Sequence, residues 1–211
     1  MSSEKATAAP ERRYRKRKRA ELEEHTRRRI TEAAMRLHGS VGPARTTVSA
    51  VAREAGVQRS TVYRHFPTDV ELFGACSQHW FSLNPPPDPG AWSGIPDPGE
   101  RLRTALGELY RWYARAEPML INVTRDAPLV PAMEAPVQAF RAWLEEMQAA
   151  LMSGRRERGR DRRRVAAAVA LALAFNTWQS LVRQAGLGNG EAVSVMAATV
   201  EAAGHVRQPG R

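Results

Sequence analysis

A short stretch between Gly56 and Phe66 concentrates hydrogen-bonding side chains on a segment of barely two helical turns. These side chains are Gln58, Arg59, Ser60, Thr61, Tyr63, Arg64 and His65. They include many donors and no carboxylate, a composition that suits contact with phosphates and with the edges of bases. Val57, Val62 and Phe66 are spaced to hold one side of the segment against a core, so the polar side stays free.

A second short helix is predicted immediately before this stretch. Thr46 or Thr47 can cap its start, because a hydroxyl accepts hydrogen bonds from the free amides of the first turn. Gly56 ends it, since glycine tolerates the positive φ of a helix C-terminus. Two helices joined by such a turn, with the small residues Ala52 and Ala55 at their crossing, form a helix-turn-helix. The second helix of that motif can enter the major groove of DNA.

The basic residues of the chain are confined to two places. The net charge is +10, of which residues 11–19 supply +6 and residues 155–164 supply +5, so the remainder is close to neutral. We expect residues 1–19 to form a disordered basic arm that follows the phosphate backbone or enters the minor groove, with Arg17 and Arg19 among its contacts. The second run is interpreted as a solvated loop, and contact with DNA or another anionic partner is the alternative.

The helix-turn-helix resembles the signature of TetR-family transcriptional regulators. The resemblance spans about residues 22–83 and is carried by Thr46-Thr47-Val48, Ala52-Arg53-Glu54-Ala55-Gly56-Val57 and Ser60-Thr61-Val62-Tyr63-Arg64-His65-Phe66. It implies a bacterial homodimeric repressor whose first three helices bind DNA. The helices that follow would then hold a small-molecule ligand and the dimer interface.

The resemblance also implies a role for individual residues. Thr47 and Ser49 match positions that touch the DNA backbone or a base. The base-reading positions correspond to Arg59, Ser60 and Thr61, and the phosphate and flanking contacts correspond to Tyr63, Arg64 and His65. Asp69 departs from the pattern, because the family usually has lysine there and an aspartate repels phosphate.

Every segment with apolar periodicity indicates a helix, so we predict an all-α protein of about nine helices. The expected helices lie near 21–39, 47–55, 58–65, 67–83, 100–115, 118–126, 131–153, 160–184 and 190–205. The proline- and glycine-rich residues 84–99 separate the fourth helix from the rest. We assign residues 20–66 to the DNA-binding domain and 67–211 to a C-terminal ligand-binding and dimerisation domain.

The C-terminal half contains aromatic, methionine and polar side chains that suit an adaptable apolar pocket. The candidate ligand-binding residues are Tyr110, Met119, Trp143, Met147, Phe175 and Asn176. The alternative is that each is simply a core residue, and for Asn176 that it forms a hydrogen bond between helices. The last two helices are predicted to pair with a second copy of the chain through Val165, Val169, Leu173, Leu181, Val193, Val195, Met196 and Val200.

Other classes of function find little support in the sequence. No catalytic constellation, cofactor motif or closely spaced histidine pair is evident, so we expect no enzyme, no cofactor and no metal site. The single cysteine, Cys76, fits a reducing cytoplasm, and the longest apolar run, 165–175, is too short to span a membrane. We therefore expect a regulator that leaves a palindromic operator on binding a small apolar or amphipathic effector. The alternative is an architectural protein that binds double-stranded DNA without sequence preference.

Overall fold

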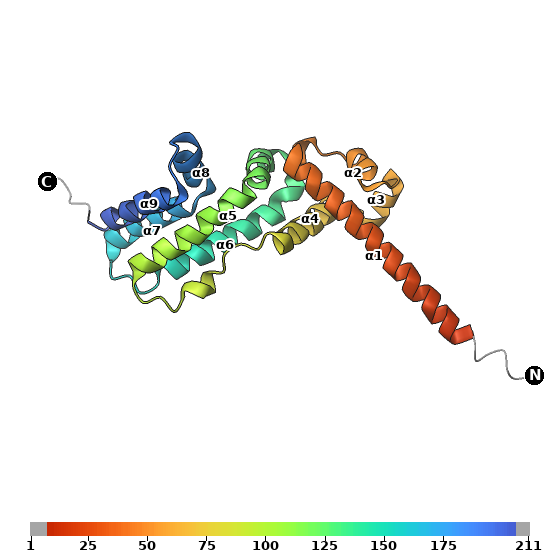
Figure 1. Cartoon of the computed structure of the whole chain (residues 1–211), viewed down its shortest axis with the longest axis horizontal. Helices are drawn as coiled ribbons and strands as arrows, with labels where there is room; N and C mark the ends of the chain where they lie inside the picture. Colours follow the sequence, from red (N-terminus) through yellow and green to blue (C-terminus); the bar gives the residue numbers. More distant parts are fainter. Residues whose placement is uncertain (1–7, 206–211) are drawn as a thin grey trace, which may run out of the picture.

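The computed structural model describes residues 8–205 of the 211-residue chain. Within that range the backbone forms nine α-helices, four short 3-10 turns and one π-helical segment, without any β-strand. The all-α prediction is therefore confirmed. The molecule is elongated, with the first four helices at one end and helices α7 and α9 at the other (Figure 1).

The N-terminal end is a small bundle with its own apolar core. It contains α1 (Ala8–Ser40), α2 (Val48–Ala55), α3 (Arg59–His65) and α4 (Asp69–Leu83). Its buried side chains are Ile30, Ala33, Ala34, Val51, Ala52, Ala55, Val62, Phe66, Leu72 and Cys76. Helix α4 also reaches the second core through Trp80 and Phe81, so it is shared between the two ends of the molecule.

Local capping fixes the ends of the short helices where the sequence predicted them. The hydroxyl of Thr47 accepts from the amide of Ala50 at 3.1 Å and begins α2, whereas the Thr46 hydroxyl donates to the carbonyl of Gly42. Gly56 ends α2 in the left-handed conformation, with φ of 63°. Thr68 caps α4 by accepting from the amide of Glu71 at 3.2 Å.

The prediction of a disordered arm is wrong for residues 8–19, which continue α1 outward as a helix whose residues 12–19 are exposed (Figure 1). Residues 1–7 lie outside the described residues. The arm lacks an apolar stripe, but arginine, lysine and glutamate favour helix once a helix has been nucleated. Ion pairs one turn apart add to this, joining Arg17 to Glu21 and Arg19 to Glu23.

The second core lies among the elements that begin with the proline- and glycine-rich residues 84–99. These elements are η2 (Pro89–Trp92), α5 (Pro98–Asp126), α6 (Glu134–Met152), α7 (Gly159–Leu173), α8 (Phe175–Trp178), the π-helical η5 (Gln179–Gln184) and α9 (Asn189–Ala203). Helix α5 is central to them, because it contacts α1 as well as α6, α7, α8 and α9.

Helix α5 replaces the two helices predicted at 100–115 and 118–126. Pro118 lies inside it and is exposed, so the helix continues past a residue that cannot donate to its hydrogen-bond ladder. Buried residues precede Pro118, from Leu109 to Ala116, and Leu120 is buried after it. Their packing keeps the helix continuous across the proline. Tertiary packing thus overrides the local break signal.

The single helix predicted over 160–184 is interrupted at Ala174, whose backbone is extended. The break frees carbonyl groups at the end of α7, and two buried phenols satisfy them. The Tyr110 hydroxyl donates to the carbonyl of Ala172 at 2.9 Å, and the Tyr113 hydroxyl donates to that of Leu173 at 2.5 Å. Donors that lie about 60 residues earlier in the chain therefore stabilise this break, which the local sequence does not reveal.

Most residues predicted to pair the last helices between copies pack inside one chain instead. Those buried within the second core are Val165, Val169, Leu173, Val193, Met196 and Val200, while Leu181 is partly buried against it. Only Val195 of that set is exposed, at 41%. The outer faces of α7 and α9 carry small exposed residues, together with the exposed Leu171.

The arginine run 155–164 is half loop and half helix rather than a solvated loop. Arg155 is buried and donates to the carbonyl of Leu151 at 3.0 Å, and the run then enters the first turns of α7. It lies at the end of the molecule opposite α2 and α3 (Figure 1). Among the described residues no single helix is long and apolar enough to cross a membrane, although α7 and 175–184, bent by 69°, pass that test as a pair.

Candidate nucleic-acid interface and internal pocket

Helix α3 presents its polar side chains outward, as the sequence predicted. Val62 and Phe66 are 1% and 2% exposed and attach the helix to the N-terminal core. The exposed side chains along α3 and its N-cap are Gln58, Arg59, Ser60, Tyr63 and Arg64. An α-helix with one anchored face and one free donor-rich face is what entry into a major groove requires.

Arginines of α1 hold the two short helices in place. Arg27 donates to the carbonyl of His65 at 2.6 Å, and its guanidinium stacks 4.1 Å from the centre of the Phe66 ring. Arg29 donates to the carbonyl of Ala55 at the end of α2. These bonds attach the C-terminal ends of α2 and α3 to the same helix, so the outward face of α3 has a defined orientation.

The side chain of Arg59 is already ordered on the exposed face. Its Nη2 donates to the Tyr63 hydroxyl at 2.9 Å, and its guanidinium lies 5.4 Å from the centre of that ring. On the basic extension of α1, the side chains of Arg17 and Arg19 are 72% and 82% exposed. Their ion pairs with glutamates are surface pairs of small energy, which a phosphate can displace.

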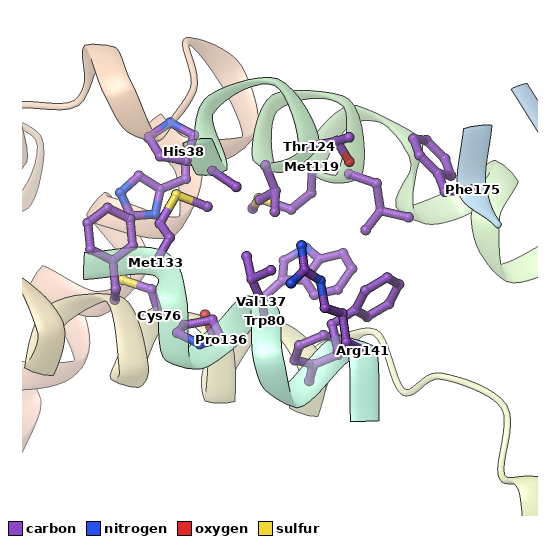
Figure 2. Close-up of a pocket in the computed structure, with 18 of the residues that line it drawn as sticks. His38, Cys76, Trp80, Met119, Thr124, Met133, Pro136, Val137, Arg141 and Phe175 are labelled. Carbon is purple, nitrogen blue, oxygen red and sulfur yellow. The ribbon is translucent and has the colours of Figure 1, made fainter. Parts of the chain in front are cut away.

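A cavity of about 450 Å³ lies behind the motif, where α1, α4, α5 and α6 meet near the start of α8 (Figure 2). This volume is within the range of about 300–1,000 Å³ found for small-molecule sites. Its lining is mostly apolar, with aromatic side chains from α4, α6 and α8 and methionines from α1 and α5. The polar members include His38, Ser77, Thr124, Arg141 and Asn176.

His38 brings the N-terminal bundle into the wall of this cavity. The residue is 5% exposed, and its ring stacks on Phe73 with 4.7 Å between ring centres. Burial lowers the pKa of His38 to about 4, so the imidazole is neutral at neutral pH. Cys76 also lines the cavity, and burial raises the pKa of its thiol to about 12.

The same region joins α5 to the end of α1. The amide of Asn122 donates to the carbonyls of His38 and Gly39 at 3.1 and 2.9 Å. Asp126 accepts from the amide of Ala44 at 3.0 Å, and hydrogen bonds from Arg125 lower the pKa of that carboxyl. A molecule in the cavity would therefore touch α1 and α4, which belong to the same N-terminal bundle as the motif. It would also touch α5, which is hydrogen-bonded to the end of α1 and to Ala44.

Comparison with known proteins identifies the family of the N-terminal helix-turn-helix. The family model for bacterial regulatory proteins of the tetR family matches residues 30–76, which contain α2, α3 and most of the N-terminal core. Residues 30–76 therefore form a domain of the TetR-family type. The matched region begins within α1 and ends at Cys76, inside the stretch for which the sequence resemblance was found.

Two proteins described as HTH-type transcriptional regulators match part of the chain. The chain is 36% identical over 85 residues to the HTH-type transcriptional regulator SrpR of Pseudomonas putida, covering 37% of this chain and 40% of that protein. It is 35% identical over 85 residues to the HTH-type transcriptional regulator TtgW, also of Pseudomonas putida, covering 37% of this chain and 63% of that protein. The chain thus spans less than two thirds of the length of either relative.

Solved structures share the fold over most of the chain at low sequence identity. NalD, the secondary repressor of the MexAB-OprM multidrug efflux pump in Pseudomonas aeruginosa, superposes with a TM-score of 0.59 and 20% identity, covering 86% of this chain and 96% of that one. A TetR-like transcriptional regulator from Rhodococcus sp. RHA1 gives a TM-score of 0.59 at 18% identity, covering 83% and 93%. Identity at this level supports the fold alone.

Two of the predicted DNA contacts in the TetR-family module require comment. Thr61 is only half-exposed, and the Nε2 atom of His65 is buried without a hydrogen-bond partner. His65 therefore lies at the base of α3 rather than on its free face, because the helix turns its last residue back toward α1. Thr47 and Ser49 remain exposed at the start of α2. Asp69 occupies the first turn of α4, where a carboxylate favours the helix N-terminus.

The cavity includes only half of the predicted ligand residues. Met119, Phe175 and Asn176 line it, with Asn176 exposed. The other three are structural: Tyr110 and Met147 are fully buried in the second core, and the Trp143 indole donates to the carbonyl of Pro87 at 3.2 Å. These residues face the core because α5 and α6 turn those sides toward α7 and the linker.

Several residues that line the cavity were not identified from the sequence. They come from α1, α4 and the start of α6, and include Met35, His38, Phe73, Ser77, Trp80, Val137 and Arg141. The helical spacing of Phe73, Ser77 and Trp80 was visible, but it equally describes a core face. Only the meeting of α4 with α6, beyond the proline-rich turns at 127–133, makes that face a pocket wall.

Proposed function

We propose that this chain is a DNA-binding transcriptional regulator that acts as a repressor on a palindromic operator. The observation that carries the proposal is the outward, donor-rich face of α3, held by Val62 and Phe66. In this proposal Arg59, Ser60 and Thr61 read bases. Phosphate contacts come from Arg17, Arg19, Thr47, Ser49, Gln58, Tyr63 and Arg64. The protein would act in the cytoplasm, where its operator lies.

The regulator is proposed to work as a homodimer through its last helices. The exposed small residues of α7 and α9, including Ala167, Ala170 and Ala198, allow the helices of a second copy to approach closely. A two-fold pair would set two copies of α3 about 34–36 Å apart, which is one turn of DNA. A palindromic site matches this symmetry.

A small apolar or amphipathic effector is proposed to release the dimer from DNA. The cavity of about 450 Å³ is bounded by α1 and α4, so an occupant bears directly on the helices that hold the motif. The effector would favour a conformer in which the two reading heads have a different spacing. The cavity also favours a regulator over an architectural protein, which needs no effector.

The proposal is tested by footprinting on DNA upstream of the protein's own gene and its neighbours. We expect a protected palindrome, whereas uniform protection would indicate the architectural alternative. Arg59→Ala should then weaken binding to the protected site by about 1–3 kcal/mol, with a smaller effect on an unrelated duplex. Arg111→Ala, on the distant helix α5, is the matched control and should leave both affinities unchanged. Equal losses on both duplexes would contradict base reading by Arg59.

A further inference from the structure

The cavity wall carries one formal charge at neutral pH. Among the residues that the structure describes, its lining includes neither aspartate nor glutamate, and its only basic side chains are those of His38 and Arg141. His38 is neutral at that pH, because burial lowers its pKa to about 4. The guanidinium of Arg141 therefore decides the sign of the electrostatic potential that an occupant meets.

Arg141 projects from α6 into the cavity (Figure 2). Among the described residues it forms neither an ion pair nor a hydrogen bond, in contrast to Arg125 and Arg183, which pair with carboxylates. Its five N–H donors are left to solvent or to an occupant. The hydroxyl of Thr124 lies on the opposite wall, where it offers a second polar contact (Figure 2).

The remaining surface around this cation is apolar. Trp80, Phe140 and Phe175 provide aromatic walls, and Met119 provides a flexible thioether. An apolar body would displace water from these walls, while a planar anionic group could accept two parallel hydrogen bonds from the guanidinium. Such charge-assisted bonds are stronger where water is partly excluded.

We infer that the effector is an amphipathic organic anion, whose carboxylate pairs with Arg141 while its apolar body packs against the aromatic walls. This inference rests on the proposed function, because it names the class of effector for the same cavity. A cationic ligand would meet repulsion from Arg141 and would find no carboxylate in the lining. A neutral ligand could accept hydrogen bonds from the guanidinium but would not neutralise its charge.

The test uses three probes that share one apolar body: naphthylacetate, naphthylacetamide and naphthylethylamine. Their affinities for the full-length protein are measured by isothermal titration calorimetry without DNA. We expect naphthylacetate to bind about tenfold more tightly than the amide, because the carboxylate neutralises the guanidinium and accepts two parallel hydrogen bonds, whereas the neutral amide has a single acceptor oxygen. The amine should bind most weakly. The preference for the carboxylate should shrink as salt is added.

Two variants assign that preference to one side chain. Arg141→Met keeps an apolar stem of similar length and should bind naphthylacetate and naphthylacetamide equally. Arg141→Lys should keep part of the preference for naphthylacetate through its charge. Arg115→Met removes an exposed charge of α5 that does not line the cavity, and it should behave as the parent protein. Circular dichroism checks that each variant is folded.

Three outcomes would overturn the inference. They are equal binding of naphthylacetate and naphthylacetamide by the parent protein, an unchanged preference for naphthylacetate in Arg141→Met, or no saturable binding of naphthylacetate. Because the titrations contain no DNA, they are independent of the proposed regulatory function. A protein that binds the acetate through Arg141 but protects no operator would retain the anion site and lose the regulator proposal. A protein that protects an operator but does not bind naphthylacetate through Arg141 would retain the regulator proposal and lose the anion site.

Discussion

At the scale of single residues, His38 connects the two parts of the molecule. It belongs to α1, yet its ring lies in the cavity wall and stacks on Phe73 of α4. Its carbonyl accepts from Asn122 of α5. Because the ring is buried and neutral, protonating it requires a charge to enter an apolar site. The histidine therefore makes stability at this junction dependent on pH.

Stability should fall in acid through His38. The folded pKa of about 4 lies below the ordinary histidine pKa of 6.5, so between these values the unfolded chain binds more protons than the folded chain. The contribution of His38 is thus complete above about pH 6.5 and is lost as the pH falls toward 4, reaching a loss of about 2 kcal/mol by pH 5. His38→Phe keeps a stacking ring without a titrating group. Urea unfolding at pH 7 and pH 5 should show a smaller acid loss in this variant, and an equal loss would contradict the assignment.

At the scale of elements, the motif depends on a turn that only glycine adopts easily. Gly56 has φ of 63°, and a Cβ atom there would meet Nη2 of Arg29 at 2.8 Å. That guanidinium is the group that caps the carbonyl of Ala55. A side chain at this position would therefore strain the backbone and disturb the contact that ties α2 to α1.

Two glycine-to-alanine substitutions should have opposite effects on stability. Gly56→Ala should destabilise the protein by about 1–2 kcal/mol, because a left-handed backbone is costly for a residue with a Cβ atom. Gly74→Ala, at an exposed position of α4 with open space around the new methyl group, should stabilise it by about 0.5–1 kcal/mol. Thermal and urea unfolding measure both changes. The turn argument fails if the two variants shift stability in the same direction.

At the scale of the whole molecule, the two basic runs lie at opposite ends. The extension of α1 projects from the end of the molecule that holds α2 and α3, whereas the run at 155–164 leads into α7 at the opposite end (Figure 1). Both runs carry similar charge, so composition cannot separate their roles. Their positions predict that only the first acts on DNA that is bound by α3.

Matched pairs of substitutions test this difference. Arg17→Gln with Arg19→Gln removes two charges from the α1 extension, and it should weaken DNA binding and reduce the salt slope by about 0.9 for each phosphate that the protein no longer neutralises. Arg160→Gln with Arg162→Gln removes two exposed charges from α7 and should leave both quantities unchanged. Fluorescence anisotropy across a range of salt concentrations measures them. Similar slopes for the two double variants would argue against a local role for the extension.

The N-terminal motif could be predicted from the sequence because its determinants are local. Thr47, Gly56 and Thr68 cap or end helices through bonds within a few residues, so their effect is visible along the chain. The helical state of residues 8–19 was missed because the prediction relied on apolar periodicity. An exposed helix of good helix formers, continuing a buried one, needs no such periodicity.

The pocket could not be predicted, because periodicity identifies a buried face without saying what covers it. Tyr110 and Met119 both lie on α5, yet Tyr110 bonds to the broken end of α7 while Met119 faces the cavity. The contribution of α1 and α4 was missed for the same reason.

By itself the sequence determined the all-α class, the helix-turn-helix and the polar outer face of α3, because short-range caps and side-chain spacing specify them. Only the tertiary structure decided where α5 stays continuous, where α7 breaks, and which side chains enclose the cavity around Arg141. Those features depend on contacts between residues far apart in the chain, such as Tyr110 with Ala172 and Asn122 with His38. No local pattern encodes such contacts, since each partner alone is compatible with many environments.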